Sequence, residues 1–223
     1  MTPLAQLPAG AWADLAGVFT DIDDTLTSDG AITPDALAAL HGLSAAGLTV
    51  IAVTGRPAGW SEPFALSWPL RAIVAENGAV ALLNQRGKLS KIYQQNEHRR
   101  ATNFARLQRA AARVLQEVPG TMLARDSAGR ETDIAIDHSE FTQLDAAHIA
   151  QVVQAMRDAG LNATVSSIHV NAWFGDHEKL HGARWIVREL WQRDLDAEID
   201  RWAYVGDSTN DVRMFEAFAL SVG

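Results

Sequence analysis

The residues from Thr20 to Gly30, TDIDDTLTSDG, place four acidic side chains in eleven positions directly after the apolar run LAGVF. Carboxylates held this close raise the free-energy cost of ionising one another. Asp21 and Asp23 are two residues apart, which puts both side chains on one face of an extended backbone. A fold tolerates such a cluster when solvent, a cation or a chemical reaction offsets the repulsion.

Two more apolar runs end in unusual polar groups. The run LTVIAV is followed by Thr54, Gly55 and Arg56, and the run RWAYV is followed by GDSTND at residues 206–211. In open α/β sheets, ligands bind outside the carboxyl ends of the strands. We therefore expect these segments to converge on one rim and form a ligand site.

The pattern between these runs predicts a parallel sheet. The segment TPDALAALHGLSAAG reads as a helix with Thr33 as N-cap, Pro34 at its first position and Gly47 just past its end. Buried runs flank it, and RAIVAENGA adds another. Alternation of strand and helix with short connections is typical of a parallel α/β sheet with right-handed crossovers.

The pattern of apolar and polar residues changes in the middle of the chain, which predicts a second domain. A hairpin with Gly87 near its turn precedes a long helix at 98–118, whose apolar side includes Phe104 and Leu107. Two alternating segments and one more helix follow, which favours an antiparallel sheet covered on one face. We expect residues 1–80 and 173–223 to form the core and residues 81–172 to form an inserted cap.

Composition narrows the class of protein. The formal net charge of −8 argues against partners such as nucleic acid or an anionic membrane. No apolar run approaches the roughly 20 residues that span a bilayer, and we expect no signal peptide. The absence of cysteine excludes disulfides and thiolate catalysis. These features predict a cytoplasmic protein, and they leave its oligomeric state open.

The acidic residues suit either a hard divalent cation or a nucleophile paired with an acid. Mg²⁺ prefers oxygen ligands, and Asp207 and Asp211 would complete a site begun by Asp21 and Asp23. Zinc is disfavoured, because cysteine is absent and the histidines are scattered. Thr54 and Gly55 offer a hydroxyl and backbone N–H donors to an anion. Lys179 precedes a predicted helix, from which its ammonium group would face the acidic rim.

In this order, DIDDT, VTGR, a later lysine and GDSTND resemble the four motifs of the haloacid dehalogenase superfamily. The position of the insertion resembles the type IIB, or Cof-like, subclass. The resemblance implies a Rossmann-like core with an α/β cap and a Mg²⁺-dependent phosphatase that acts on the phosphate monoester of a sugar or sugar derivative. It assigns Asp21 as the nucleophile that forms an aspartyl-phosphate and Asp23 as the acid and base.

The resemblance also implies roles for the other motif residues. Thr54 and Lys179 would bind the phosphoryl group and steady the nucleophile. The metal would contact Asp21, the Asp23 carbonyl and Asp207, with Asp211 in support. Further expected contacts to substrate or metal are Gly55, Arg56, Asn77, Arg130, His169, Asn171 and Asn210.

Other functions remain open at this point. A phosphosugar mutase is one alternative. A non-catalytic protein of the same fold that binds a phosphorylated ligand is another, although it would be expected to have lost a motif residue and none is lost here. A signalling receiver domain would be shorter and uncapped. A dinucleotide-binding enzyme would need a GxGxxG motif after the first strand, and this motif is absent there.

Overall fold

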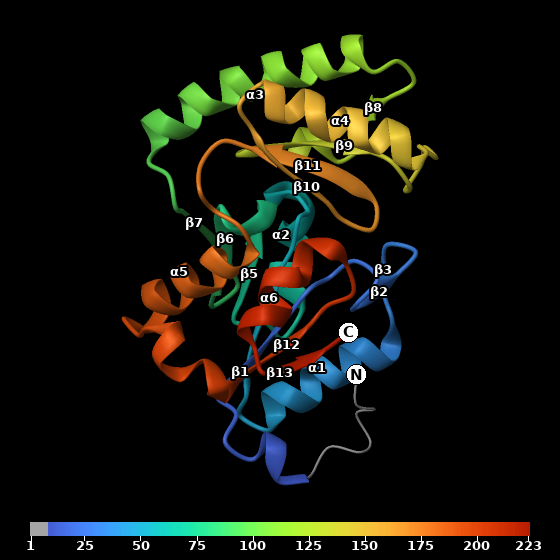
Figure 1. Cartoon of the computed structure of the whole chain (residues 1–223). Coiled ribbons are helices and arrows are strands. Elements are labelled where there is room, and N and C mark those ends of the chain that lie inside the picture. The colour runs from blue at the N-terminus through green and yellow to red at the C-terminus, as the bar shows by residue number, and fades with distance from the viewer. Residues whose placement is uncertain (1–8) are drawn as a thin grey trace.

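A seven-stranded sheet lies at the centre of the lower part of the molecule (Figure 1) in a computed structural model that describes residues 9–223. Its strand order is β13-β12-β1-β4-β5-β6-β7. The strands from β13 to β5 are parallel, whereas β6 and β7 are antiparallel to their neighbours. The strands span Gly17–Thr20 (β1), Thr49–Val53 (β4), Ala72–Ala75 (β5), Val80–Gln85 (β6), Lys88–Tyr93 (β7), Trp202–Val205 (β12) and Leu220–Val222 (β13).

Both faces of the sheet are buried at the central strands β1, β4 and β5, which explains why these strands are almost wholly apolar. Ile51 and Val53 face one core cluster with α5 and α6, whereas Val50 and Ala52 face another with α1 and α2. The helices span Pro34–Ala45 (α1), Ala58–Ser67 (α2), Lys179–Trp191 (α5) and Val212–Ala217 (α6). Thr33 caps α1 by accepting a hydrogen bond from the Ala36 N–H, as predicted.

The hairpin of β6 and β7 belongs to the core sheet, which corrects the expectation that the insertion begins at residue 81. β6 pairs with β5, and its residues Val80, Ala81 and Leu82 are fully buried. The predicted turn is present, because Arg86 and Gly87 both have positive φ, the conformation of a two-residue hairpin turn. We propose that the inserted cap starts after Tyr93 instead.

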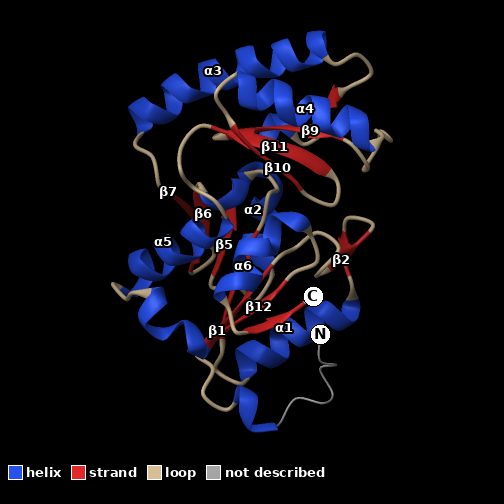
Figure 2. Cartoon of the chain, viewed as in Figure 1, coloured by secondary structure: helices blue, strands red, loops and turns tan. Residues whose placement is uncertain are grey.

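The upper part of the molecule is a four-stranded antiparallel sheet in the order β10-β11-β9-β8 (Figure 2). Helices α3 (Glu97–Glu117) and α4 (Ala146–Asp158) cover the face of this sheet that points away from the core (Figure 1). The strands span Met122–Leu123 (β8), Asp133–Asp137 (β9), Asn162–Val165 (β10) and His169–Trp173 (β11). The expected α/β cap, with helices on one face of an antiparallel sheet, is therefore present.

The helix-covered side of the cap sheet is apolar and the other side is polar. Ile134, Ile136 and Val170 pack under the helices, which leaves alternate residues such as His169 and Asn171 to face the core. One prediction about α3 was wrong, because Phe104 is 43% exposed. The buried residue in that turn is Asn103, whose amide donates to Gln95.

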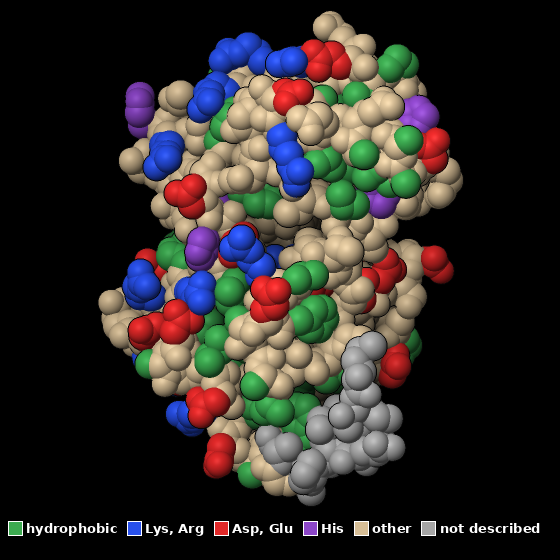
Figure 3. Space-filling view, viewed as in Figure 1, with side chains coloured by type: hydrophobic (Ala, Val, Ile, Leu, Met, Phe, Trp, Pro, Cys, Tyr) green, Lys and Arg blue, Asp and Glu red, His purple; other side chains and the backbone are tan. Residues whose placement is uncertain are grey.

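Short elements complete the described chain. A small hairpin joins β2 (Thr27–Ser28) and β3 (Ala31–Ile32). The 3-10 turns span Ala9–Trp12, Glu76–Gly78, Ser127–Gly129, Leu195–Arg201 and Thr209–Asp211. No helix among residues 9–223 is both long and apolar enough to cross a membrane. A hollow is visible between the cap and the core in Figure 3, and a cleft of about 520 Å³ lies there, lined by residues of β10, α5 and α6.

Candidate active site

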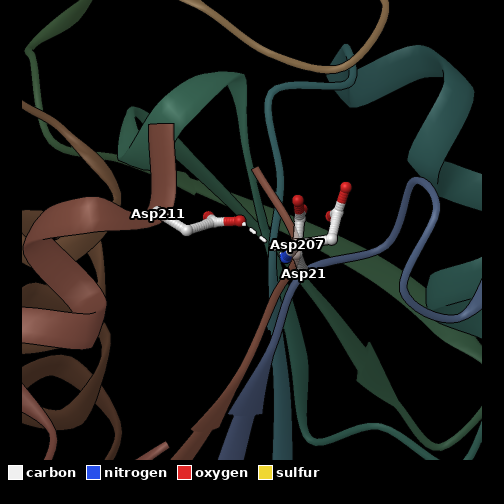
Figure 4. Close-up of side chains that lie close together, drawn as sticks. All are labelled: Asp21, Asp207 and Asp211. Atoms are coloured by element: carbon white, nitrogen blue, oxygen red, sulfur yellow. Dashed lines mark hydrogen bonds between the residues drawn. The ribbon is translucent and has the colours of Figure 1, made fainter. Parts of the chain in front are cut away.

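Three carboxylates converge at the carboxyl end of the core sheet (Figure 4). Asp21 follows β1 and Asp207 lies just beyond β12, its parallel neighbour, while Asp211 ends the turn before α6. One oxygen from each carboxylate lies within 4.8 Å of the others. Three oxygen donors at this spacing fit a hard divalent cation, which prefers carboxylates and water as ligands.

Lys179 places its ammonium group among these carboxylates. It is the first residue of α5, and its Nζ lies 2.9 Å from Asp21 Oδ2 and 2.7 Å from Asp211 Oδ1. Burial raises the pKa of Asp21 to about 7, against the opposing effect of the Lys179 charge. Burial also opposes ionisation of Asp211, but Lys179 lowers the pKa of that carboxyl below its usual value. The positive charge of Lys179 thus offsets the electrostatic repulsion among the clustered carboxylates.

Asp211 is held in place from several sides. The Tyr204 hydroxyl donates to its Oδ1, and the backbone N–H groups of Asp207 and Ser208 donate to its Oδ2 at 3.2 and 3.1 Å. Because both of its oxygens accept hydrogen bonds, Asp211 is better suited to orient Lys179 and the 207–208 loop than to contact a cation directly. Asp207 is freer, since it is exposed and accepts only from the Thr25 hydroxyl among the described residues.

Asp23 pairs with the guanidinium of Arg56, whereas Asp21 pairs with Lys179. Both of its carboxylate oxygens accept from Arg56 Nε, at 2.9 and 3.0 Å. Burial raises the pKa of Asp23, and the Arg56 guanidinium acts in the opposite direction. The two aspartates predicted to act together therefore lie on the same loop, with Asp21 tied to α5 and Asp23 tied to the loop that follows β4.

Thr54, Gly55 and Asn77 lie close together, since the Asn77 N–H donates to the Thr54 carbonyl at 3.0 Å. Thr54 is fully buried, and its Oγ1 accepts from the Arg56 N–H at 3.0 Å. A Cβ atom on Gly55 would lie 3.4 Å from side-chain atoms of both Asn77 and Asn171. Asn77 Nδ2 is buried with no hydrogen-bond partner among residues 9–223. Such a donor fits an acceptor on a bound molecule.

The predicted cap residues reach the same region. Asn171 Nδ2 and Arg130 Nη1 both donate to the Gly55 carbonyl, at 3.2 and 3.0 Å. His169 Nε2 lies 2.9 Å from a carboxylate oxygen of Glu140. Arg130 is also paired with Asp133. The structure therefore gathers Arg130, His169 and Asn171 over the core site.

Asn210 lies in the turn that ends at Asp211. Its Oδ1 accepts from the Ser208 hydroxyl at 2.5 Å, and it is half-buried. The neighbouring Thr209 hydroxyl donates to the Val165 carbonyl of the cap at 2.8 Å. Cap and core are thus in contact at this turn as well.

Sequence reasoning missed three carboxylates that join the core to the cap. Asp126 and Glu140 pair with Arg56 at 3.1 and 2.9 Å. Glu76 is fully buried and accepts hydrogen bonds from Ala58, Glu131 and Thr132. The only signal in the sequence was an acidic residue between apolar runs, at AENG and DHSEF, and such residues are also common on surfaces.

A family model described as haloacid dehalogenase-like hydrolase matches residues 18–116. The matched segment contains the DIDDT and VTGR motifs, which supports the resemblance of this chain to the haloacid dehalogenase superfamily. The predicted resemblance is thus confirmed, and all four of its motifs lie around the acidic cluster of this haloacid dehalogenase-like chain. A search of curated protein sequences finds no significant match.

Solved structures share the fold of this haloacid dehalogenase-like chain over almost all of its length. A Thermoplasma acidophilum protein has a TM-score of 0.68 at 19% identity, covering 92% of this chain and 82% of its own. The sucrose-phosphatase of Synechocystis, solved with sucrose and phosphate, has a TM-score of 0.64 at 16% identity, covering 93% and 82%. A subclass IIB sugar phosphatase of the superfamily has a TM-score of 0.62 at 15% identity, covering 92% and 85%. These likenesses establish the capped fold.

Proposed function

We propose that the protein is a Mg²⁺-dependent phosphatase that hydrolyses a phosphate monoester of a sugar or sugar derivative. The observation that carries the proposal is the position of Asp21, which shares Lys179 with Asp211 and lies within reach of Asp207. A nucleophilic carboxylate, an ammonium group and a second acid thus meet where the carboxyl ends of β1 and β12 adjoin the first residue of α5.

In the first step, a carboxylate oxygen of Asp21 attacks phosphorus, and the bond from phosphorus to the leaving oxygen breaks. Asp23 gives its proton to that oxygen, which departs as an alcohol. In the second step, the Asp23 carboxylate takes a proton from water, which attacks the aspartyl-phosphate. The bond from phosphorus to Asp21 then breaks and releases inorganic phosphate. Two steps of this kind replace one very slow hydrolysis.

Other residues hold the phosphoryl group during both steps. Thr54 Oγ1 accepts from the Arg56 N–H, which leaves its hydroxyl proton available to a phosphoryl oxygen. Lys179 neutralises charge on the phosphoryl group and holds Asp21. Mg²⁺ bound by Asp21, Asp207 and the Asp23 carbonyl, with Asp211 in support, would neutralise the remaining charge and favour ionised Asp21.

Polar residues of the cap and the structural neighbours of the chain both support a sugar as the leaving group. His169 and Asn171 present polar groups to the core, and polar groups of this kind recognise hydroxyls. The neighbours include a sucrose-phosphatase and a subclass IIB sugar phosphatase. A sugar phosphate is the substrate class that agrees with both.

Phosphate release from a panel of sugar phosphates, phosphoglycerate derivatives and nucleotides would test the proposal, with Mg²⁺ and with a chelator. We expect Mg²⁺-dependent release from sugar phosphates and a loss of roughly 10³-fold or more in Asp21→Asn. The matched control is Asp200→Asn, since Asp200 is exposed and precedes β12, at the opposite end of that strand from Asp207. Full activity of a folded Asp21→Asn variant would contradict the mechanism. Conversion of one sugar phosphate into another without phosphate release would indicate a mutase.

A further inference from the structure

Arg56, on the loop that follows β4, makes an unusual set of contacts. Its guanidinium meets three carboxylates at once: Asp23 at 2.9 Å, Asp126 at 3.1 Å and Glu140 at 2.9 Å. Only 5% of its side chain is exposed. A buried guanidinium with this many charged partners has a single orientation, because every donor edge is occupied.

The three partners come from both parts of the molecule. Asp23 belongs to the core loop after β1, whereas Asp126 precedes the turn Ser127–Gly129 and Glu140 follows β9 in the cap. Arg56 itself lies two residues beyond Thr54 on the loop after β4. One core side chain therefore links the proposed acid and base to two carboxylates that the cap supplies.

The cap carboxylates are themselves fixed. Asp126 accepts from Arg130 Nη2 at 3.1 Å. Glu140 lies 2.9 Å from His169 Nε2, and its backbone N–H donates to Asp137 at 3.0 Å. Both therefore approach Arg56 from a rigid side of the cap sheet. They hold the guanidinium only while the cap lies against the core.

We propose that Asp126 and Glu140 are positioning residues for Asp23 and act on it through Arg56. When the cap docks, its two carboxylates fix the guanidinium, and the guanidinium fixes the Asp23 carboxyl in the orientation that serves the leaving oxygen. When the cap moves away, Arg56 loses two of its three anionic partners, and its side chain becomes free to adopt other rotamers. The inference rests on the proposed function, because it assigns Asp23 to proton transfer.

A simpler role for the same contacts is to fasten the cap to the core. The structure offers an internal comparison, because Lys91 of β7 also pairs with a cap carboxylate, Glu131, at 2.7 Å. That pair joins the two parts without contacting Arg56 or Asp23. If fastening were the whole role, Glu131→Gln would act like Glu140→Gln.

Two substrates with different leaving groups distinguish these roles. p-Nitrophenyl phosphate releases a phenolate that needs little protonation, whereas a sugar phosphate releases an alcohol that needs a proton as the bond breaks. The quantity to compare is kcat/KM, which covers only the steps up to departure of the leaving group. Folding of each variant is checked by thermal unfolding.

We expect Asp126→Asn, Glu140→Gln and Arg56→Lys each to lower kcat/KM for the sugar phosphate by about 10-fold or more. For p-nitrophenyl phosphate we expect the same variants to lose about 3-fold or less, and Glu131→Gln to leave the ratio between substrates unchanged. Equal losses on both substrates, or the same change of ratio in Glu131→Gln, would overturn the inference alone. Wild-type inactivity on both substrates and on the wider panel would overturn the proposed function and this inference with it.

Discussion

Lys179 Nζ lies 2.9 Å from the carboxylate of Asp21, and the same nitrogen lies 2.7 Å from Asp211. Lys179→Met would leave two buried carboxylates without their cation, which costs about 3–5 kcal/mol when a buried pair is broken. We expect the variant to be less stable by that order and inactive in phosphate release. Urea unfolding and a phosphate assay measure both effects. Lys179→Arg retains the charge, and a loss of stability as large as that of Lys179→Met would contradict the electrostatic explanation.

Tyr204 supports the same cluster from below. Its side chain is fully buried, and its hydroxyl donates to Asp211. Tyr204→Phe would remove one hydrogen bond to a charged group, so we expect a loss of about 1.5–3 kcal/mol in the free energy of unfolding. We also expect the Mg²⁺ concentration for half-maximal activity to rise, because Asp211 would hold the 207–208 loop less firmly. Tyr93→Phe serves as the control, and an equal shift in its Mg²⁺ requirement would count against this role.

Glu76 joins the core to the cap through backbone groups. Its carboxylate accepts from the N–H groups of Ala58, Glu131 and Thr132 and from the Thr132 hydroxyl. Glu76→Gln places an amide N–H₂ against these donors, and we expect it to lower the free energy of unfolding by about 2–4 kcal/mol. Calorimetry would detect this and any separate melting of the cap. The exposed Glu216→Gln variant is the control, and similar effects of both changes would argue against a structural role for Glu76.

His177 predicts a pH dependence of stability that is separate from catalysis. Burial lowers the pKa of this imidazole from 6.5 to about 4. The unfolded chain therefore binds the proton more tightly, so the stability from neutral His177 is complete above pH 6.5 and is lost as the pH falls to about 4. The full shift corresponds to about 3 kcal/mol.

Denaturant unfolding between pH 7.5 and 4 would measure this contribution. His177→Phe keeps the stacking on Trp173 and removes the titrating group, so its stability should fall less with acidification than that of the wild type. His41→Phe replaces an exposed histidine of α1 and should follow the wild-type curve. Parallel curves for His177→Phe and the wild type would show that another group governs the acid limb.

Much of the core could be predicted because its strands are buried on both faces. A short apolar run such as Thr49–Val53 is typical of a strand that is covered on both faces, and this one is buried almost throughout. Helix α2 was not predicted, since Gly59 and Pro63 both disfavour a helix interior. Tertiary packing overrides that preference, because the rings of Trp60, Phe64 and Trp68 contact one another along α2 and at its end.

Some residues of the candidate site could likewise be predicted from the sequence, and others could not. Asp21, Thr54, Lys179 and Asp211 could be predicted, because each lies in a short motif at a strand or helix end. Asp126 and Glu140 could not, since their partner Arg56 lies 70 and 84 residues away along the chain. No local pattern encodes a contact that forms only when two separately folded segments meet.

The backbones of Gly59 and Gly129 nearly touch where α2 of the core meets the turn before Arg130 in the cap. A Cβ atom on Gly59 would lie 2.9 Å from Gly129 Cα, and one on Gly129 would lie 3.2 Å from Gly59 Cα. A side chain at either position would push the two backbones apart and so hold the cap away from the core. This contact therefore offers a handle for engineering. Gly129→Val should favour an open arrangement of cap and core without altering any residue assigned to phosphate binding. Comparison with the wild type would then separate the free energy of cap closure from the activation free energy of the reaction.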